Sequence, residues 1–262
     1  MPLTCCCMID PVGMLSAGSI AWIGAVFLAA GFVKGVVGMG LPTVAMGLLV
    51  VTMPPAEAAA LLLIPSLVTN LWQLFTGPAF GGLCRRLWTM MAGIMLGTVA
   101  GAGVLTGAHA GAASVGLGSA LVLYAILGLF KLSFTTPARH EALMSPLVGV
   151  ATGLVTGATG VFVIPAVPYL QSLRLEKEDL IQALGLSFTV STAALAIGLF
   201  RTGALASPTA QLTGSILALL PALAGMFIGQ ALRQAMGVET FRKVFLVGLL
   251  TLGVYLVLEA LR

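Results

Sequence analysis

Lys34 is the single basic residue between the N-terminus and Arg85, and it lies inside a long apolar segment. A charge at membrane depth costs at least ~2.5 kcal/mol and usually faces a cavity or a partner. No acidic residue lies between Asp10 and Glu57, so an anionic ligand is a candidate partner for the Lys34 ammonium group. The other interpretation is that Lys34 lies shallow and extends its side chain to the membrane surface.

A polar stripe follows downstream. Its residues are spaced i, i+3, i+4 and i+7, which places them on one helix face, and in an apolar helix that face should point inward. The stripe consists of Ser66, Thr69, Asn70 and Gln73, and its counterpart in the second half of the chain includes Gln182, Ser187, Ser191 and Thr192. These side chains can donate hydrogen bonds to the oxygens of an anion or hold helices together, and both roles stay open.

A glycine motif occurs twice, as Gly31-x-x-x-Gly35-x-x-Gly38 and as Gly153-x-x-x-Gly157-x-x-Gly160, and each copy is followed by a proline. Both segments should therefore break at membrane depth, where irregular backbone is tolerated only when it is buried in protein or lines a cavity. The half-helices expected to begin near Leu41 and Val161 would point free N–H groups and the positive ends of their dipoles at an anion. The alternative is that the glycines only permit close helix packing. The predicted site at the breaks consists of Gly35, Gly38, Gly40, Pro42, Thr156, Gly157, Gly160 and Pro165.

The composition is that of a polytopic membrane protein. Of the 262 residues, 59% are hydrophobic and 8% are charged, and the mean hydropathy is +1.12, whereas a soluble domain carries about 25% charged residues. We expect one membrane domain over residues 1–262, with no nucleic-acid partner. Cys5, Cys6 and Cys7 crowd the N-terminus and Cys84 stands alone, so neither a metal site nor a cofactor is expected.

The apolar segments predict two similar halves, repeat one over 15–131 and repeat two over 146–261. Each half has a broken segment, at 15–52 or 146–172, followed by three helices. The second of the three helices in each half carries a G-x-x-x-G, Gly97/Gly101 and Gly225/Gly229. The predicted helices lie at 56–76, 87–107 and 112–131 in the first half, and at 178–200, 210–234 and 240–261 in the second.

Basic residues indicate how the halves are oriented. If each broken segment crosses the membrane once, the flanking Lys and Arg split six against five. If each dips in and returns, as a re-entrant hairpin or a close pair of half-helices, they split nine against two, which is the bias of a cytoplasmic face. An odd number of passes makes the repeats inverted, with both termini outside. The nine are Arg85, Arg86, Lys131, Arg139, Arg174, Lys177, Arg233, Arg242 and Lys243, and the two are Arg201 and Arg262.

The chain resembles the sulfite exporter TauE/SafE family, also called the toluene sulfonate uptake permease family. The resemblance rests on the glycine-rich turn from Gly31 to Pro42, the Pro-Ala-Glu-Ala stretch at 55–58, and the second copy over 153–165, and it covers essentially the whole chain. It implies a small permease for sulfite, sulfonates or related anions. Many relatives carry Thr-Asn-Lys early in the helix after the first break, where this chain has Leu61-Leu62-Leu63.

Together these features predict an all-α inner-membrane transporter that moves a small anion by alternating access around the two breaks. It is not expected to be an enzyme, because it has two histidines and no acidic cluster within a span. A passive anion channel and, less favoured, a membrane-embedded enzyme are the alternatives. The solute, the direction of transport, the coupling ion and a homo-oligomeric state stay open.

Overall fold

The computed structural model describes residues 17–106, 110–130, 136–204, 208–233 and 238–260, and these are helical apart from their connections. Cys5, Cys6 and Cys7 lie outside these ranges. Eight of the helices are long and apolar enough to cross a membrane. The described helices are α1 (Ala17–Val37), α2 (Leu41–Leu49), α3 (Pro55–Phe75), α4 (Phe80–Thr106), α5 (Ala110–Leu129), α6 (Ala138–Thr159), α7 (Ala166–Ser172), α8 (Lys177–Arg201), α9 (Pro208–Leu232) and α10 (Val238–Ala260).

The first break lies where the sequence places it, between α1 and α2. Gly38 and Gly40 have φ angles of 84° and 108°, a left-handed conformation that glycine adopts without steric cost. After the break the chain turns back toward the start of α1. This is shown by Trp22, near the start of α1, which donates a hydrogen bond of 3.2 Å to Thr52, just after α2. The first broken segment is therefore a hairpin of one long and one short helix.

The second broken segment is also a hairpin, but its boundaries differ from those expected. Thr136, just before α6, contacts Ser172 at the end of α7, with 2.6 Å between the hydroxyl oxygens. Helix α6 begins at Ala138 rather than near 146, because Pro137 precedes its first turn and Glu141 in that turn pairs with Arg86. Its first turns therefore include residues that lie between the two predicted repeats.

The short helix α7 begins at Ala166 and not near Val161. Gly160 ends α6 with a φ of 71°, and its N–H donates to the carbonyl oxygen of Thr156 at 2.7 Å. The next four residues, Val-Phe-Val-Ile, include three with β-branched side chains, which are poor helix formers. Pro165 then stands immediately before the helix.

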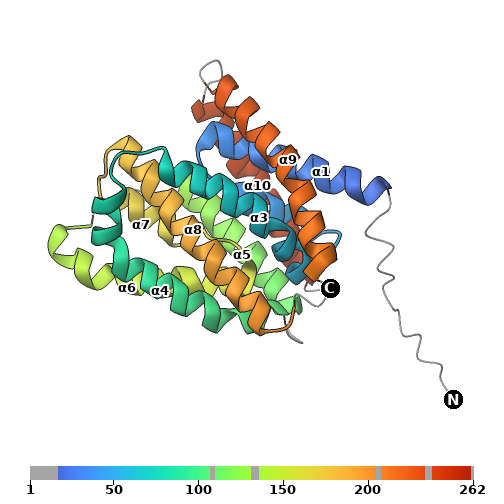
Figure 1. The fold of residues 1–262 in the computed structure, drawn as a ribbon, viewed down its shortest axis with the longest axis horizontal. Helices are drawn as coiled ribbons and strands as arrows, with labels where there is room; N and C mark the ends of the chain where they lie inside the picture. The colour runs from blue at the N-terminus through green and yellow to red at the C-terminus, as the bar shows by residue number, and fades with distance from the viewer. Residues whose placement is uncertain (1–16, 107–109, 131–135, 205–207, 234–237, 261–262) are drawn as a thin grey trace.

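Two pairs of parallel helices form the sides of the molecule (Figure 1). Gly31 on α1 contacts Ala222 on α9, and Gly35, one turn later, contacts Gly229, so the two helices run in the same direction. Helices α4 and α6 are related in the same way, from Gly93 at Val150 to Gly101 at Gly157. Each pair joins the broken segment of one half to the second of the three following helices of the other half.

Helices α3 and α8 lie between these two pairs and run antiparallel. Gly77 at the end of α3 faces Gln182 near the start of α8, while Asn70 reaches Thr192 farther along α8. Helices α5 and α10 are also antiparallel, since Gly118 contacts Gly253 and Gly128 contacts Leu246.

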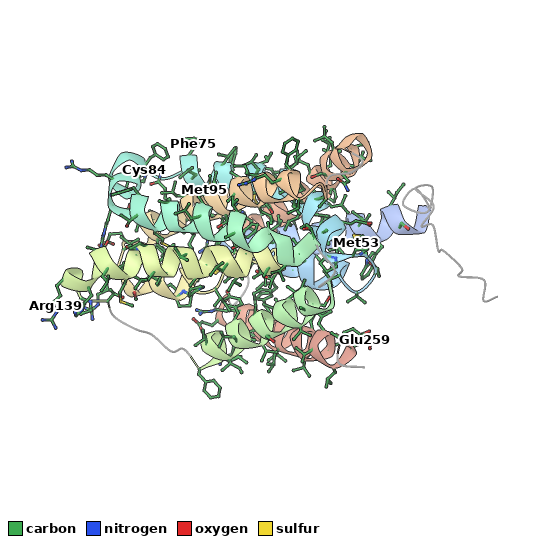
Figure 2. The ribbon with its side chains drawn as sticks, turned by 90° about the horizontal axis from the view of Figure 1, so that it is seen from below. Met53, Phe75, Cys84, Met95, Arg139 and Glu259 are labelled. Atoms are coloured by element: carbon green, nitrogen blue, oxygen red, sulfur yellow. The ribbon has the colours of Figure 1, made fainter. Side chains whose placement is uncertain are left out.

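The surface has apolar side chains exposed along the helices and basic residues gathered at one end. Leu96 and Phe200 are 71% and 76% exposed, as expected for side chains that face lipid. Figure 2 shows Cys84 and Arg139 at one end of the molecule and Met53 and Glu259 at the other. We call the first end the basic face; the helix directions place there Arg85, Arg86, Arg139, Arg174, Lys177, Arg233, Arg242 and Lys243.

Candidate solute-binding site

The Lys34 ammonium group lies inside the protein, where three helices meet. Its side chain is 4% exposed, so it does not reach the membrane surface. Nζ donates to Thr69 Oγ1 at 3.1 Å and to Asn70 Oδ1, both on α3. Asn70 in turn donates from Nδ2 to Thr192 Oγ1 on α8 at 3.4 Å. These four residues, from α1, α3 and α8, are called the lysine cluster below.

The lysine cluster holds a cation with neutral oxygens. Thr69 donates its hydroxyl proton to the carbonyl oxygen of Pro65 at 2.7 Å, so its lone pairs face Lys34. Thr192 likewise donates to Phe188, one turn back in its own helix, at 2.7 Å. Among the described residues no carboxylate pairs with Lys34. A buried cation without a carboxylate partner is suited to attract an anionic solute.

A proline inside α3 helps to position the lysine cluster. Pro65 has no N–H, which leaves the carbonyl oxygen of Leu61 without its helical partner. Ser215 on α9 donates its hydroxyl to that oxygen at 2.8 Å and accepts the N–H of Ile64 at 3.1 Å. The helix therefore continues through the proline and carries Thr69 and Asn70 to Lys34.

Three predicted or neighbouring serines have hydroxyl groups available to a ligand. Ser66 is one turn before Thr69 and Asn70, and Ser187 and Ser191 precede Thr192 on α8. All three are buried, and their hydroxyl oxygens have no hydrogen-bond partner in the described part of the chain. Buried polar groups are rarely left unpaired, so such hydroxyls are candidates for binding a ligand.

The two glutamines of the polar stripes form hydrogen bonds with backbone groups instead. Gln73 on α3 donates to the carbonyl oxygen of Ile181 on α8 at 2.8 Å. Gln182 donates to the carbonyl oxygens of Leu74 and Gly77, at 2.7 and 2.9 Å, and its Oε1 accepts the N–H of Ala79 at 2.8 Å. The structure therefore places Gln73 in the contact between α3 and α8, away from the lysine cluster.

Replacing Gln182 with leucine should lower the free energy of unfolding by about 2 to 3 kcal/mol, because three backbone groups at the end of α3 lose their partner. Thermal unfolding of the purified protein in detergent measures the change. Gln211→Leu is the matched control, since Gln211 makes one bond of 3.4 Å and its Oε1 has no partner within the described chain. Equal losses for the two variants would contradict the assigned role of Gln182.

The glycines of the two motifs divide into two groups. Gly35 and Gly157 lie in helix contacts: a Cβ at Gly35 would overlap the backbone of Met226 on α9, and one at Gly157 would overlap the backbone of Thr98 on α4. Gly38, Gly40 and Gly160 have positive φ and make the turns of the breaks. The G-x-x-x-G of Gly97 and Gly101 thus packs against the second glycine motif on α6, and that of Gly225 and Gly229 packs against the first glycine motif on α1.

Of the remaining predicted residues, the two prolines stand at the starts of the short helices and Thr156 lies in the last turn of α6. Pro42 is in the first turn of α2 and Pro165 directly precedes α7. Thr156 donates its hydroxyl to the carbonyl oxygen of Thr152 at 2.8 Å. The N–H of Val161 donates to Thr159 Oγ1 at 3.2 Å, so at the second break this amide is already bound within the protein.

A cavity of about 510 Å³ opens beside the first break. Its walls include Gly38, the only predicted site residue among them, together with Tyr124 on α5 and parts of α7 and α8. Its charged lining consists of Lys177, Arg233, Arg242 and Glu239, giving a net positive rim. Gly38 in the cavity wall lies one helical turn after Lys34, and its N–H donates to the carbonyl oxygen of Lys34 at 2.8 Å.

The cavity residues were missed by reasoning from motifs, because they come from six separate segments of the chain. One signal was available: Lys177, Arg233 and Arg242 belong to the group of basic residues assigned to a single membrane face.

A family model described as Sulfite exporter TauE/SafE matches residues 23–256. No curated protein and no solved structure matches the chain.

Proposed function

The chain belongs to the sulfite exporter TauE/SafE family of membrane transporters, and from that premise we propose that it carries a small sulfur-containing or carboxylate anion across the inner membrane by alternating access. The observation that carries this proposal is the buried Lys34 ammonium group, which is held by Thr69 and Asn70 without a carboxylate partner in the described chain. The solute supplies the missing negative charge.

Recognition rests on the charge of Lys34 and on the hydroxyl groups near it. Hydrogen bonds to a charged acceptor contribute about 1.5 to 3 kcal/mol each. Ser66 lies one turn before Thr69 and Asn70 on α3, Ser191 and Ser187 precede Thr192 on α8 by one and five residues, and each has a hydroxyl proton that it can turn toward an oxygen of the solute. Sulfite, a sulfonate and a carboxylate all present such oxygens.

The two halves are inverted repeats in this proposal, with both termini outside and the basic face in the cytoplasm. Three observations support it: both broken segments are hairpins, the corresponding helices α3 and α8 are antiparallel, and so are α5 and α10. Inverted repeats place a binding site near the membrane midplane, at the interface of the repeats. The bond between Asn70 and Thr192 crosses that interface.

Uptake into liposomes bearing the purified protein tests the function. Sulfite, thiosulfate, sulfoacetate and acetate are supplied separately, with and without a proton gradient, and we expect saturable uptake of at least one of them, with counterflow. Uptake that never saturates and shows no counterflow would indicate a passive channel. If none of the four is transported above the rate of empty liposomes, the proposed class of solute is contradicted.

A further inference from the structure

The charged residues that line the cavity beside the first break lie at the end of the protein that bears the basic face. Lys177, Arg233 and Arg242 of the basic face line it, together with Gly38 and with Leu184 on α8. Because the two halves have matching elements, a matching cavity at the opposite end would be formed by the corresponding residues of the other half.

A shift of 122 residues relates the two halves over the broken segments and the helix after each. It superimposes Gly31, Gly35 and Gly38 on Gly153, Gly157 and Gly160. It also superimposes Pro55 on Lys177, the first residues of α3 and α8. The same shift relates Asn70 to Thr192, the two residues whose side chains meet where α3 and α8 cross.

The residues that correspond to part of the cavity wall are buried in the hydrophobic core instead. Six wall residues, Gly38, Val167, Pro168, Gln171, Leu180 and Leu184, correspond to Gly160, Ala45, Met46, Leu49, Ala58 and Leu62. All six of the latter are buried, and the five that have side chains are 0% exposed. We call these six the apolar gate.

The contact between Met46 and Gly160 lies at the centre of the apolar gate. A Cβ built on Gly160 would be 2.8 Å from the terminal methyl carbon of Met46, so the methionine side chain fills the space that the missing side chain leaves. At the corresponding place in the other half, a Cβ on Gly38 would meet nothing within 4 Å. The same turn is therefore closed in one half and open in the other.

We infer that the apolar gate closes the transport route on the face opposite the basic face, and that the structure represents the state open to the basic face. The inference rests on the proposed transport function and adds to it the residues that must separate. In the opposite state the gate lines a cavity, and the present cavity wall packs together. An apolar contact suits this task, because a hydrated anion cannot pass through side chains that offer it no hydrogen bonds.

Thiol labelling tests the gate without depending on the solute. In a background with Cys5, Cys6, Cys7 and Cys84 replaced by serine, one cysteine is introduced at Leu49 in the gate or at Leu180 in the cavity wall. A membrane-impermeant maleimide is then added to either side of sealed vesicles, with Arg139→Cys marking the basic face. We expect Leu180→Cys to react from the side of Arg139 and Leu49→Cys to react, more slowly, from the other side alone.

Met46→Ala should then shift the balance between the states. Removing the side chain that fills Gly160 weakens only the closed form of the gate, so labelling of Leu49→Cys should rise at least about tenfold while labelling of Leu180→Cys falls. Leu28→Ala, an exposed apolar residue of α1, is the control and should change neither rate. Thermal unfolding of each variant verifies that the protein is folded.

Two results would overturn the inference: no labelling of Leu49→Cys from the side opposite Arg139 in folded protein, even with Met46→Ala, or labelling of Leu49→Cys from the side of Arg139. The failure of the gate and that of the proposed function are distinguishable. Reciprocal labelling without transport of any anion would contradict the solute and keep the gate, whereas saturable transport without labelling at Leu49 would contradict the gate alone.

Discussion

Lys34→Met is expected to lower the rate of anion transport at least about 100-fold, equivalent to about 2.7 kcal/mol of lost interaction with the solute. Methionine is nearly as long as lysine and uncharged, so it fills the same space while removing the charge that the solute neutralises. Folding should be preserved, because the substitution removes a buried charge instead of creating one. Initial uptake rates in liposomes and thermal unfolding measure the two effects separately.

Lys243→Met is the matched control for Lys34→Met. Lys243 lies on the basic face, is exposed, and lines neither the cavity nor the lysine cluster. Its loss should change the transport rate less than about twofold, since exposed charges interact weakly through water and salt. Equal transport by Lys34→Met and the unsubstituted protein would remove Lys34 from the site, and the proposal would then lose the observation on which it depends.

Much of the helical arrangement could be predicted from the sequence, because the decisive signals are local. Apolar length predicts the spans, and Gly38, Gly40 and Pro42 predict the first break, since glycine and proline act on their own backbone. The spacing of Thr69 and Asn70 predicts a shared helix face. That face contacts Lys34 in the structure, a pairing that the sequence left open between a buried role and a shallow one.

The remainder depends on which helices meet, and one sequence does not supply that information. The G-x-x-x-G of Gly97 and Gly101 does not by itself indicate which helix it contacts, and the packing of α4 on α6 shows that its partners are Gly153 and Gly157. The sequence is equally consistent with Gln73 binding a ligand and with Gln73 holding two helices together. The structure shows its amide donating to the carbonyl oxygen of Ile181 on α8 at 2.8 Å. The cavity likewise exists only after six distant segments have come together.

Gly35→Ala is expected to destabilise the protein by about 3 kcal/mol or more, because it places a methyl group inside the contact between α1 and α9. The added Cβ would overlap the carbonyl oxygen of Met226 and lie 2.8 Å from the backbone nitrogen of Gln230. Both are backbone atoms of a helix, which cannot rotate aside as a side chain can. The helices must separate along the contact that joins the two halves of the chain.

Gly24→Ala makes the same change in the same helix and is the control. A Cβ at Gly24 meets nothing within 4 Å, and alanine is a better helix former than glycine by up to about 1 kcal/mol, so this variant should be unchanged or slightly more stable. Gly38→Ala should fall between the two: its Cβ also meets nothing, but its φ of 84° costs a non-glycine residue about 1 to 2 kcal/mol. Thermal unfolding in detergent measures all three. Because Gly35 packs against α9 while Gly38 only turns the chain, we expect the largest loss of stability for Gly35→Ala, a smaller loss for Gly38→Ala and none for Gly24→Ala. A larger loss for Gly38→Ala than for Gly35→Ala would mean that the first motif stabilises the protein mainly through the turn and not through the helix contact.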